Sequence, residues 1–195
     1  MSGIVGGINL RSSGLVNISS ASDGQVFTGT GAGLPVGFEA AAGGGKILQV
    51  ISATKTDTAS STSLTFANVS GLSVAITCAA TSSKILILAT VPSQGAAASG
   101  VAYIRLAVGG SALCVGDASG SKDRVSGSYM GTNNSTETCS INFLHSPSST
   151  SEQTYTIQHA SGGSYTTYVN RNTNDVDAAG TPRTASTITC IEVGA

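Results

Sequence analysis

The stretch Leu72-Ser73-Val74-Ala75-Ile76-Thr77-Cys78 decides the fold class, because larger apolar residues alternate along it with small or polar ones. A period of two places one set of side chains in a core and the other set outside, which is typical of a half-buried β-strand. A second stretch, Lys84-Ile-Leu-Ile-Leu-Ala-Thr-Val91, has apolar residues at both its odd-numbered and its even-numbered positions. It predicts a central strand that is buried on both faces of its sheet.

Similar short runs recur along the chain, separated by clusters of Gly, Ser, Asn and Pro that are typical of hairpins and loops. About ten strands at such spacing predict an all-β fold, a β-sandwich of jelly-roll type. The run Ala185–Val193 predicts a central closing strand with Ile188 and Cys190 on its inner face. The other candidate strands are 46–52, 63–67, 101–108, 112–115, 124–130, 137–145, 153–159 and 166–170. The predicted core residues are Ile85, Ile87, Ile104, Leu106, Ile157, Ile188 and Cys190.

The composition supports a β protein and excludes several functions. Ser, Thr and Gly make up 78 of the 195 residues, and these are weak helix formers. The apolar fraction of 40% and the net charge of −1 argue against disorder. The scattered Lys and Arg residues form no basic patch, so we expect no nucleic-acid partner. No apolar run is long enough for a membrane span, and no secretory signal is evident. We therefore expect the chain to be made and assembled in a cytoplasm.

The four cysteines, Cys78, Cys114, Cys139 and Cys190, contain no CxxC pair, so the sequence predicts no zinc site. Cys78, Cys114 and Cys190 sit in apolar β-like runs, which favours free cysteines packed in a core. One or two disulfides remain the alternative.

Residues 1–45 differ from the remainder of the chain, since apolar residues there stand isolated among Gly and Ser. The segment ends in Ala40-Ala41-Ala42-Gly43-Gly44-Gly45, which is typical of a flexible linker. We expect residues 1–45 to form an extended arm and hinge that folds against another protein, and residues 46–195 to form the β-sandwich head. The predicted docking residues of the arm are Ile4, Val5, Ile8, Leu10, Leu15, Val16, Ile18, Val26, Phe27 and Phe38.

No motif predicts catalysis, a cofactor or a metal. Gly29–Gly33 departs from the dinucleotide-binding pattern, and Gly43–Lys46 departs from a P-loop. His145 and His159 each end a strand run, and no GxSxG elbow accompanies them. The loop Asn170–Asp177 carries several oxygen donors but lacks the turn Gly of a calcium loop. A polar turn is favoured there, with a weak cation site as the alternative.

The stretch Asp23-Gly-Gln-Val-Phe-Thr-Gly-Thr-Gly-Ala-Gly-Leu-Pro-Val-Gly-Phe-Glu39 resembles a linker element of fibre and tail-associated proteins of tailed bacteriophages, particularly marine ones. Residues 46–50, 71–76 and 83–87 are similar to the start of the β domain that follows it, and residues 145–150, 155–157, 168–171 and 186–193 to its closing strands. His145 departs from the pattern, where Asp is common, and residues 92–136 carry little resemblance.

The resemblance implies a virion structural protein that forms a homotrimer of sister chains, and we expect it to have no enzyme activity. Its arm would dock on phage capsid or tail proteins, and its head would be displayed outward as a short fibre or adhesin. The adhesin interpretation adds a host cell-surface glycan or protein as a partner. The alternative is a capsid decoration protein, or head fibre, that braces the shell. A third class, a carbohydrate-processing enzyme of the virion, requires a carboxylate pair in an aromatic groove, and aromatic residues are only 5% of the chain.

Overall fold

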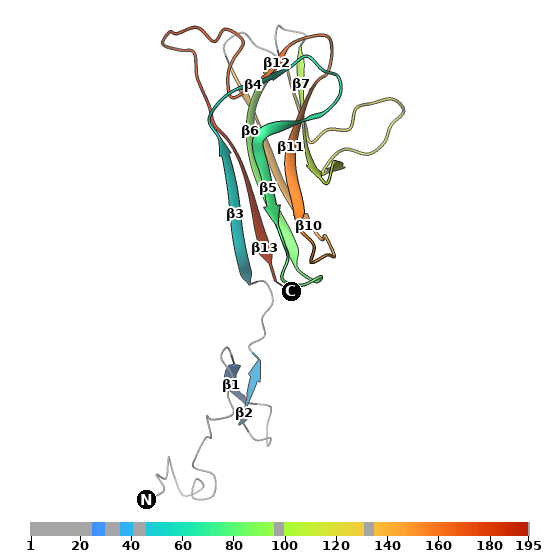
Figure 1. Cartoon of the computed structure of the whole chain (residues 1–195), viewed down its shortest axis with the longest axis vertical. Coiled ribbons are helices and arrows are strands. Elements are labelled where there is room, and N and C mark those ends of the chain that lie inside the picture. Colours follow the sequence, from blue (N-terminus) through green and yellow to red (C-terminus); the bar gives the residue numbers. More distant parts are fainter. Residues whose placement is uncertain (1–24, 30–35, 41–45, 96–99, 131–134, 195) are drawn as a thin grey trace, which may run out of the picture. The chain divides into compact units, whose positions relative to one another are not determined.

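The computed structural model describes residues 25–29, 36–40, 46–95, 100–130 and 135–194. All regular elements in this part of the chain are strands (Figure 1), so the all-β prediction is confirmed. No helix among the described residues is long and apolar enough to cross a membrane. The chain divides into two units, residues 1–44 and residues 45–195, which are described separately below.

The first unit contains a short antiparallel hairpin. Strand β1 (Gln25–Gly29) pairs with β2 (Val36–Ala40), and Phe27 lies opposite Phe38 in the register. The sequence predicted no strand here, because single Gly and Thr residues interrupt every apolar run. Of the predicted docking residues, Val26, Phe27 and Phe38 belong to this hairpin. The others lie outside the described residues: Ile4, Val5, Ile8, Leu10, Leu15, Val16 and Ile18.

The second unit is a sandwich of two antiparallel sheets. The first sheet has β6 at its centre. One edge of β6 pairs with β10 along its length, and the other edge pairs first with β13 and then with β12. The edge strands β3 and β4 pair with β13 and β12, respectively. The strands of this sheet are β3 (Ile47–Lys55), β4 (Ala59–Ser61), β6 (Lys84–Gly95), β10 (Glu137–His145), β12 (Thr167–Val169) and β13 (Ser186–Val193).

The second sheet is built around β11, which pairs with β5 on one side and with β7 on the other. The outer edge of β7 is shared by two short strands, with β9 along its first half and β8 along its second half. The strands of this sheet are β5 (Ala67–Ile76), β7 (Val101–Val108), β8 (Ser111–Leu113), β9 (Gly127–Met130) and β11 (Gln153–Ser161).

The core lies between the two sheets and follows the alternation of the sequence. Along β13, buried and half-buried residues alternate without a break, and the strand lies centrally between β3 and β6, as predicted. The largest buried side chain is that of Tyr155 on β11. The structure places every predicted core residue at 0% exposure, namely Ile85, Ile87, Ile104, Leu106, Ile157, Ile188 and Cys190.

Two strand predictions are wrong. Within the predicted strand 63–67, residues 64 and 65 form a bend and only Ala67 belongs to a strand, as the first residue of β5. The prediction that Lys84–Val91 is buried on both faces is also wrong, although β6 is central. Leu88 is 36% exposed and Leu86 is half-buried, because no further layer covers the outer face of this sheet among the described residues.

The cysteines are all free thiols. Cys78, Cys139 and Cys190 are buried, as core packing predicts, and burial raises the pKa of Cys190 to about 12. Cys114 is exposed, which corrects the expectation of a buried strand residue. Strand β8 ends at Leu113, and Cys114 adopts a positive φ of 51° in the loop that follows.

We expect Ile188→Ala to destabilise the protein by about 2–5 kcal/mol, because the substitution leaves a cavity between the sheets. Thr187→Ala, on the outer face of the same strand, is the control, with an expected loss below about 1 kcal/mol. Urea unfolding of both variants measures the two effects. A loss within about 0.5 kcal/mol for Ile188→Ala would show that this face of β13 is not in the core.

Candidate interaction surfaces

An aliphatic row crosses the outer face of the first sheet. Val50 on β3 lies opposite Ile191 on β13, which lies opposite Leu86 on β6, which in turn lies opposite Leu144 on β10. On the two middle strands the neighbouring residues Ile87 and Cys190 are fully buried in the core, so this row lies on the outward face. Val50 is 56% exposed and Leu144 is 50% exposed. The row is therefore a continuous apolar strip on an open sheet face.

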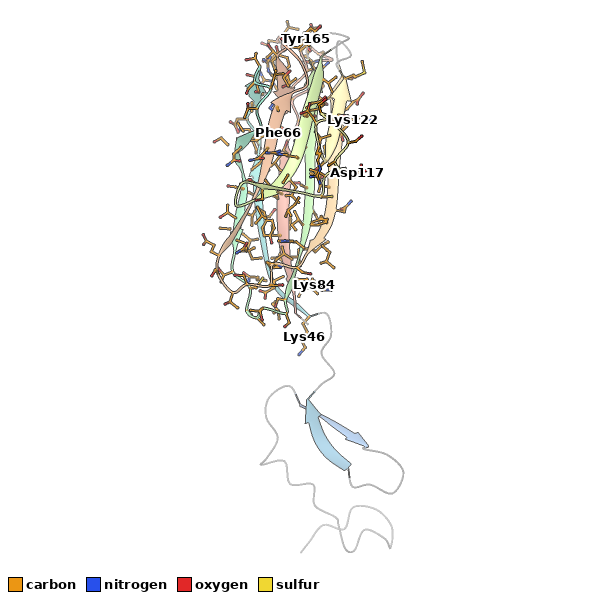
Figure 2. All side chains as sticks on the ribbon, turned by 90° about the vertical axis from the view of Figure 1, so that its right-hand side faces the viewer. Lys46, Phe66, Lys84, Asp117, Lys122 and Tyr165 are labelled. Carbon is orange, nitrogen blue, oxygen red and sulfur yellow. The ribbon has the colours of Figure 1, made fainter. Side chains whose placement is uncertain are left out.

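The remainder of this face is almost uncharged. Ser52, Thr189 and Thr90 lie on it next to Leu88, and the Ser52 and Thr189 hydroxyls are hydrogen-bonded at 2.8 Å. Among the outward positions of β3, β13, β6 and β10, only Lys84 carries a charge. Figure 2 labels Lys84 at the same end of the sandwich as Lys46, with Tyr165 at the opposite end.

The outer face of the second sheet carries a different arrangement, a cluster of aromatic rings and amides around one guanidinium group. We call Phe66, Asn68, Tyr103, Arg105 and Gln158 the Arg105 cluster. The guanidinium carbon of Arg105 lies 3.9 Å from the centroid of the Phe66 ring. The rings of Phe66 and Tyr103 are stacked with centroids 6.5 Å apart. Figure 2 labels Phe66 between the two ends of the sandwich.

Hydrogen bonds hold the polar members of the Arg105 cluster in place. Arg105 Nε donates to Gln158 Oε1 at 2.7 Å, and Gln158 Nε2 donates to Asn68 Oδ1 at 2.8 Å. Partial burial lowers the pKa of Arg105, yet a guanidinium group stays charged at neutral pH. Half-buried rings beside fixed donors and acceptors can contact both the apolar and the hydroxyl faces of a bound sugar or peptide.

A buried amide fixes the end of the sandwich at which β12 and β13 are joined. Asn170 is fully buried and has a positive φ of 64°. Its Nδ2 donates to the carbonyl oxygens of Lys55 and Asp57, both at 2.9 Å. Its Oδ1 accepts a hydrogen bond from the Ser186 hydroxyl at 2.6 Å. Asn170 therefore ties the end of β3 to the start of β13.

The loop that follows Asn170 is held by charge pairs, which weakens its interpretation as a cation site. The Asp175 carboxylate forms ion pairs with two guanidinium groups. Its Oδ2 lies 2.9 Å from Arg171 Nη1, and its Oδ1 lies 2.6 Å from Arg183 Nη2. Two guanidinium groups beside one carboxylate disfavour a bound cation. The described residues contain no cluster of metal-ligating side chains. The geometry of this loop therefore favours a polar turn over a weak cation site.

The two histidines take part in packing. His145 Nδ1 is hydrogen-bonded to the Tyr155 hydroxyl at 2.8 Å, and burial lowers the pKa of His145. His159 is 3% exposed, lies 2.6 Å from the Thr167 hydroxyl through Nε2, and borders a small pocket between β4 and β5. Burial lowers the pKa of His159 to about 4, so its ring is neutral at neutral pH.

The burial of His159 makes stability pH-dependent. Its folded pKa of about 4 lies below an unfolded value of ~6.5. The stabilisation is therefore complete above pH ~6.5 and declines as the pH falls toward the folded pKa. Between pH ~7 and ~5 we expect the wild type to lose about 2 kcal/mol more unfolding free energy than His159→Gln. Urea unfolding of the wild type and of His159→Gln at both pH values tests this. An unchanged pH dependence in His159→Gln would contradict the prediction.

A buried carboxylate at the other end of the sandwich has no signal in the sequence. Glu192 is fully buried, and its Oε2 and Oε1 accept hydrogen bonds from Gln49 Nε2 at 2.6 Å and from Ala79 N at 2.7 Å. Burial alone would raise the pKa of Glu192, but these hydrogen bonds outweigh it and the pKa is lowered. Gln49 Nε2 also donates to the Thr77 carbonyl oxygen at 2.7 Å, so Glu192 and Gln49 join β3, β13 and the loop after β5.

No protein-family model matches this chain, and no curated protein matches its sequence. The interaction surfaces therefore have to be interpreted from their own chemistry, together with the sequence resemblance described above.

Proposed function

We propose that the protein is a structural component of a bacteriophage virion, a short trimeric fibre or adhesin that acts by binding rather than by catalysis. Residues 1–45 attach it to capsid or tail proteins, and residues 46–195 form the displayed head. The protein is assembled in the host cytoplasm and resides in the virion. The observation that carries this proposal is the division of the chain. The described hydrophobic core lies within residues 69–190, and the Gly-rich residues 1–44 form a unit of their own.

The strand order supports the finer proposal that the head is a jelly roll. Its eight main strands, in chain order, are β3, β5, β6, β7, β9, β10, β11 and β13. One sheet then combines the first, eighth, third and sixth of these, and the other combines the second, seventh, fourth and fifth. This order supports a jelly roll, an architecture that recurs in viral capsid and lectin domains.

The Arg105 cluster is the surface best suited to a host receptor. Aromatic rings, a guanidinium group and fixed amides are the groups that proteins use to bind sugars and exposed peptide segments. We therefore propose that a host cell-surface glycan or protein contacts this face of the second sheet.

Competition with the phage for its host cells tests the adhesin function. Purified full-length protein, added to host cells first, is expected to reduce adsorption of the particles. The double variant Phe66→Ala, Arg105→Ala is expected to lose this effect, while Thr154→Ala, at an exposed site outside the Arg105 cluster, retains it. Circular dichroism confirms that each variant is folded. If saturating wild-type protein leaves adsorption unchanged, the adhesin function is wrong, and capsid decoration becomes the better proposal.

A further inference from the structure

We propose that copies of this chain associate with one another through the outer face of β3, β13, β6 and β10, with the aliphatic row of Val50, Ile191, Leu86 and Leu144 at the centre of the contact. The inference rests on the proposed function in one respect, since it assigns a surface to the proposed trimer. The row itself is an observation on the sandwich and does not depend on a virion.

The exposure of this face favours a covered state. Ile47 is 66% exposed, Leu88 is 36% exposed, and Val193 adds a half-buried side chain at the same end. Together with the aliphatic row, these side chains form a contiguous apolar patch on the order of 500 Å², and patches of this size often mark interaction sites.

The charge on this face favours a second copy of the same chain over a charged partner. Identical surfaces repel one another when they carry several charges of one sign, and this face carries only Lys84 at its end. The hydroxyl groups of Ser52, Thr189 and Thr90 border the row on one side with neutral polar groups. An apolar centre with a polar rim is the usual composition of a protein interface.

The second sheet shows that such a row is not a general property of this sandwich. At its exposed outward positions β5 carries Ser73 and Ala75, and β11 carries Thr154. These small or polar side chains lie across the two strands in register, Ser73 opposite Thr156 and Ala75 opposite Thr154. The large aliphatic side chains are concentrated on the other sheet, so that sheet is the one assigned to contact between copies.

The mass of the full chain in solution tests this inference without any phage particle. The wild type is expected to have three times the chain mass of 19.2 kDa by light scattering after gel filtration. The double variant Val50→Lys, Leu144→Lys is expected to be a monomer, because it places charges within the contact. The matched control, Ser73→Lys, Thr154→Lys, carries the same added charge on the other sheet and is expected to remain a trimer.

A milder variant keeps the test valid if the lysine variant does not fold. Val50→Thr preserves the β-branched shape on an edge strand, and together with Leu144→Asn it is expected to weaken association on the order of a hundredfold. A monomeric wild type would overturn the inference, as would a trimer that neither set of substitutions weakens. A dimer dissociated by these substitutions would support the face and overturn the three-fold number. A trimer that never enters particles would overturn the proposed function and leave this inference intact.

Discussion

A chain shortened to residues 46–195 is expected to fold as a β protein and to be absent from phage particles. Its fold should persist because the described core, from Val69 to Cys190, lies entirely within this segment. Its attachment should fail because the removed segment carries the ten apolar residues predicted to dock. Burying half of them at about 1.5–3 kcal/mol each would give a substantial docking energy. Three linked arms would strengthen attachment further, since each bound arm holds the others near their sites.

Particles produced with the shortened chain in place of the full one provide the measurement, by quantitative mass spectrometry after purification. The matched control is the full chain with Phe27→Ser and Phe38→Ser, which keeps the length and replaces the paired aromatic residues of β1 and β2. We expect intermediate occupancy for this control. Normal occupancy of the shortened chain would show that the head carries the docking surface.

Asn170→Ala is expected to lower the unfolding free energy by about 3–5 kcal/mol. The substitution leaves the carbonyl oxygens of Lys55 and Asp57 and the buried Ser186 hydroxyl without their side-chain partner. It also forces alanine into a left-handed conformation, with φ at 64°.

Two further variants separate these causes by urea unfolding. Asn170→Gly loses the same hydrogen bonds but accepts the positive φ, so we expect a smaller loss than for alanine. Ser186→Ala removes only the hydroxyl partner and is expected to cost about 1–2 kcal/mol. A loss below about 1 kcal/mol for Asn170→Ala would show that Asn170 does not tie β3 to β13.

The strands were predictable because their signal is local. The alternation along 101–108 and 137–145 gives the observed bounds of β7 and β10. The wrong strand prediction at 63–67 has a physical reason. Leu64 and Phe66 are both apolar, but neither packs in the core between the sheets. Leu64 is 65% exposed in a bend, and Phe66 packs against the Arg105 guanidinium group outside the sheet.

The surfaces were less predictable because they depend on which strands become neighbours. Leu86 and Leu144 are far apart in the sequence and indistinguishable there from core residues. Only the register of β6 with β10 places them side by side on an outer face. The Arg105 cluster likewise needs the pairing of β11 with β5 and with β7. The outward-facing positions of Lys84–Val91 are apolar, which is compatible with an exposed apolar row. The same pattern also predicts a strand buried on both faces, so the sequence alone does not distinguish the two.

Counting the protein on purified particles, and locating it there by electron microscopy with an antibody against the head, tests the proposed function most directly. The expected result is a small copy number in multiples of three, with the label on projections from the particle. A copy number comparable to that of the capsid protein, with label spread over the shell, would favour decoration instead. Particles that contain none of the protein would contradict a virion function altogether.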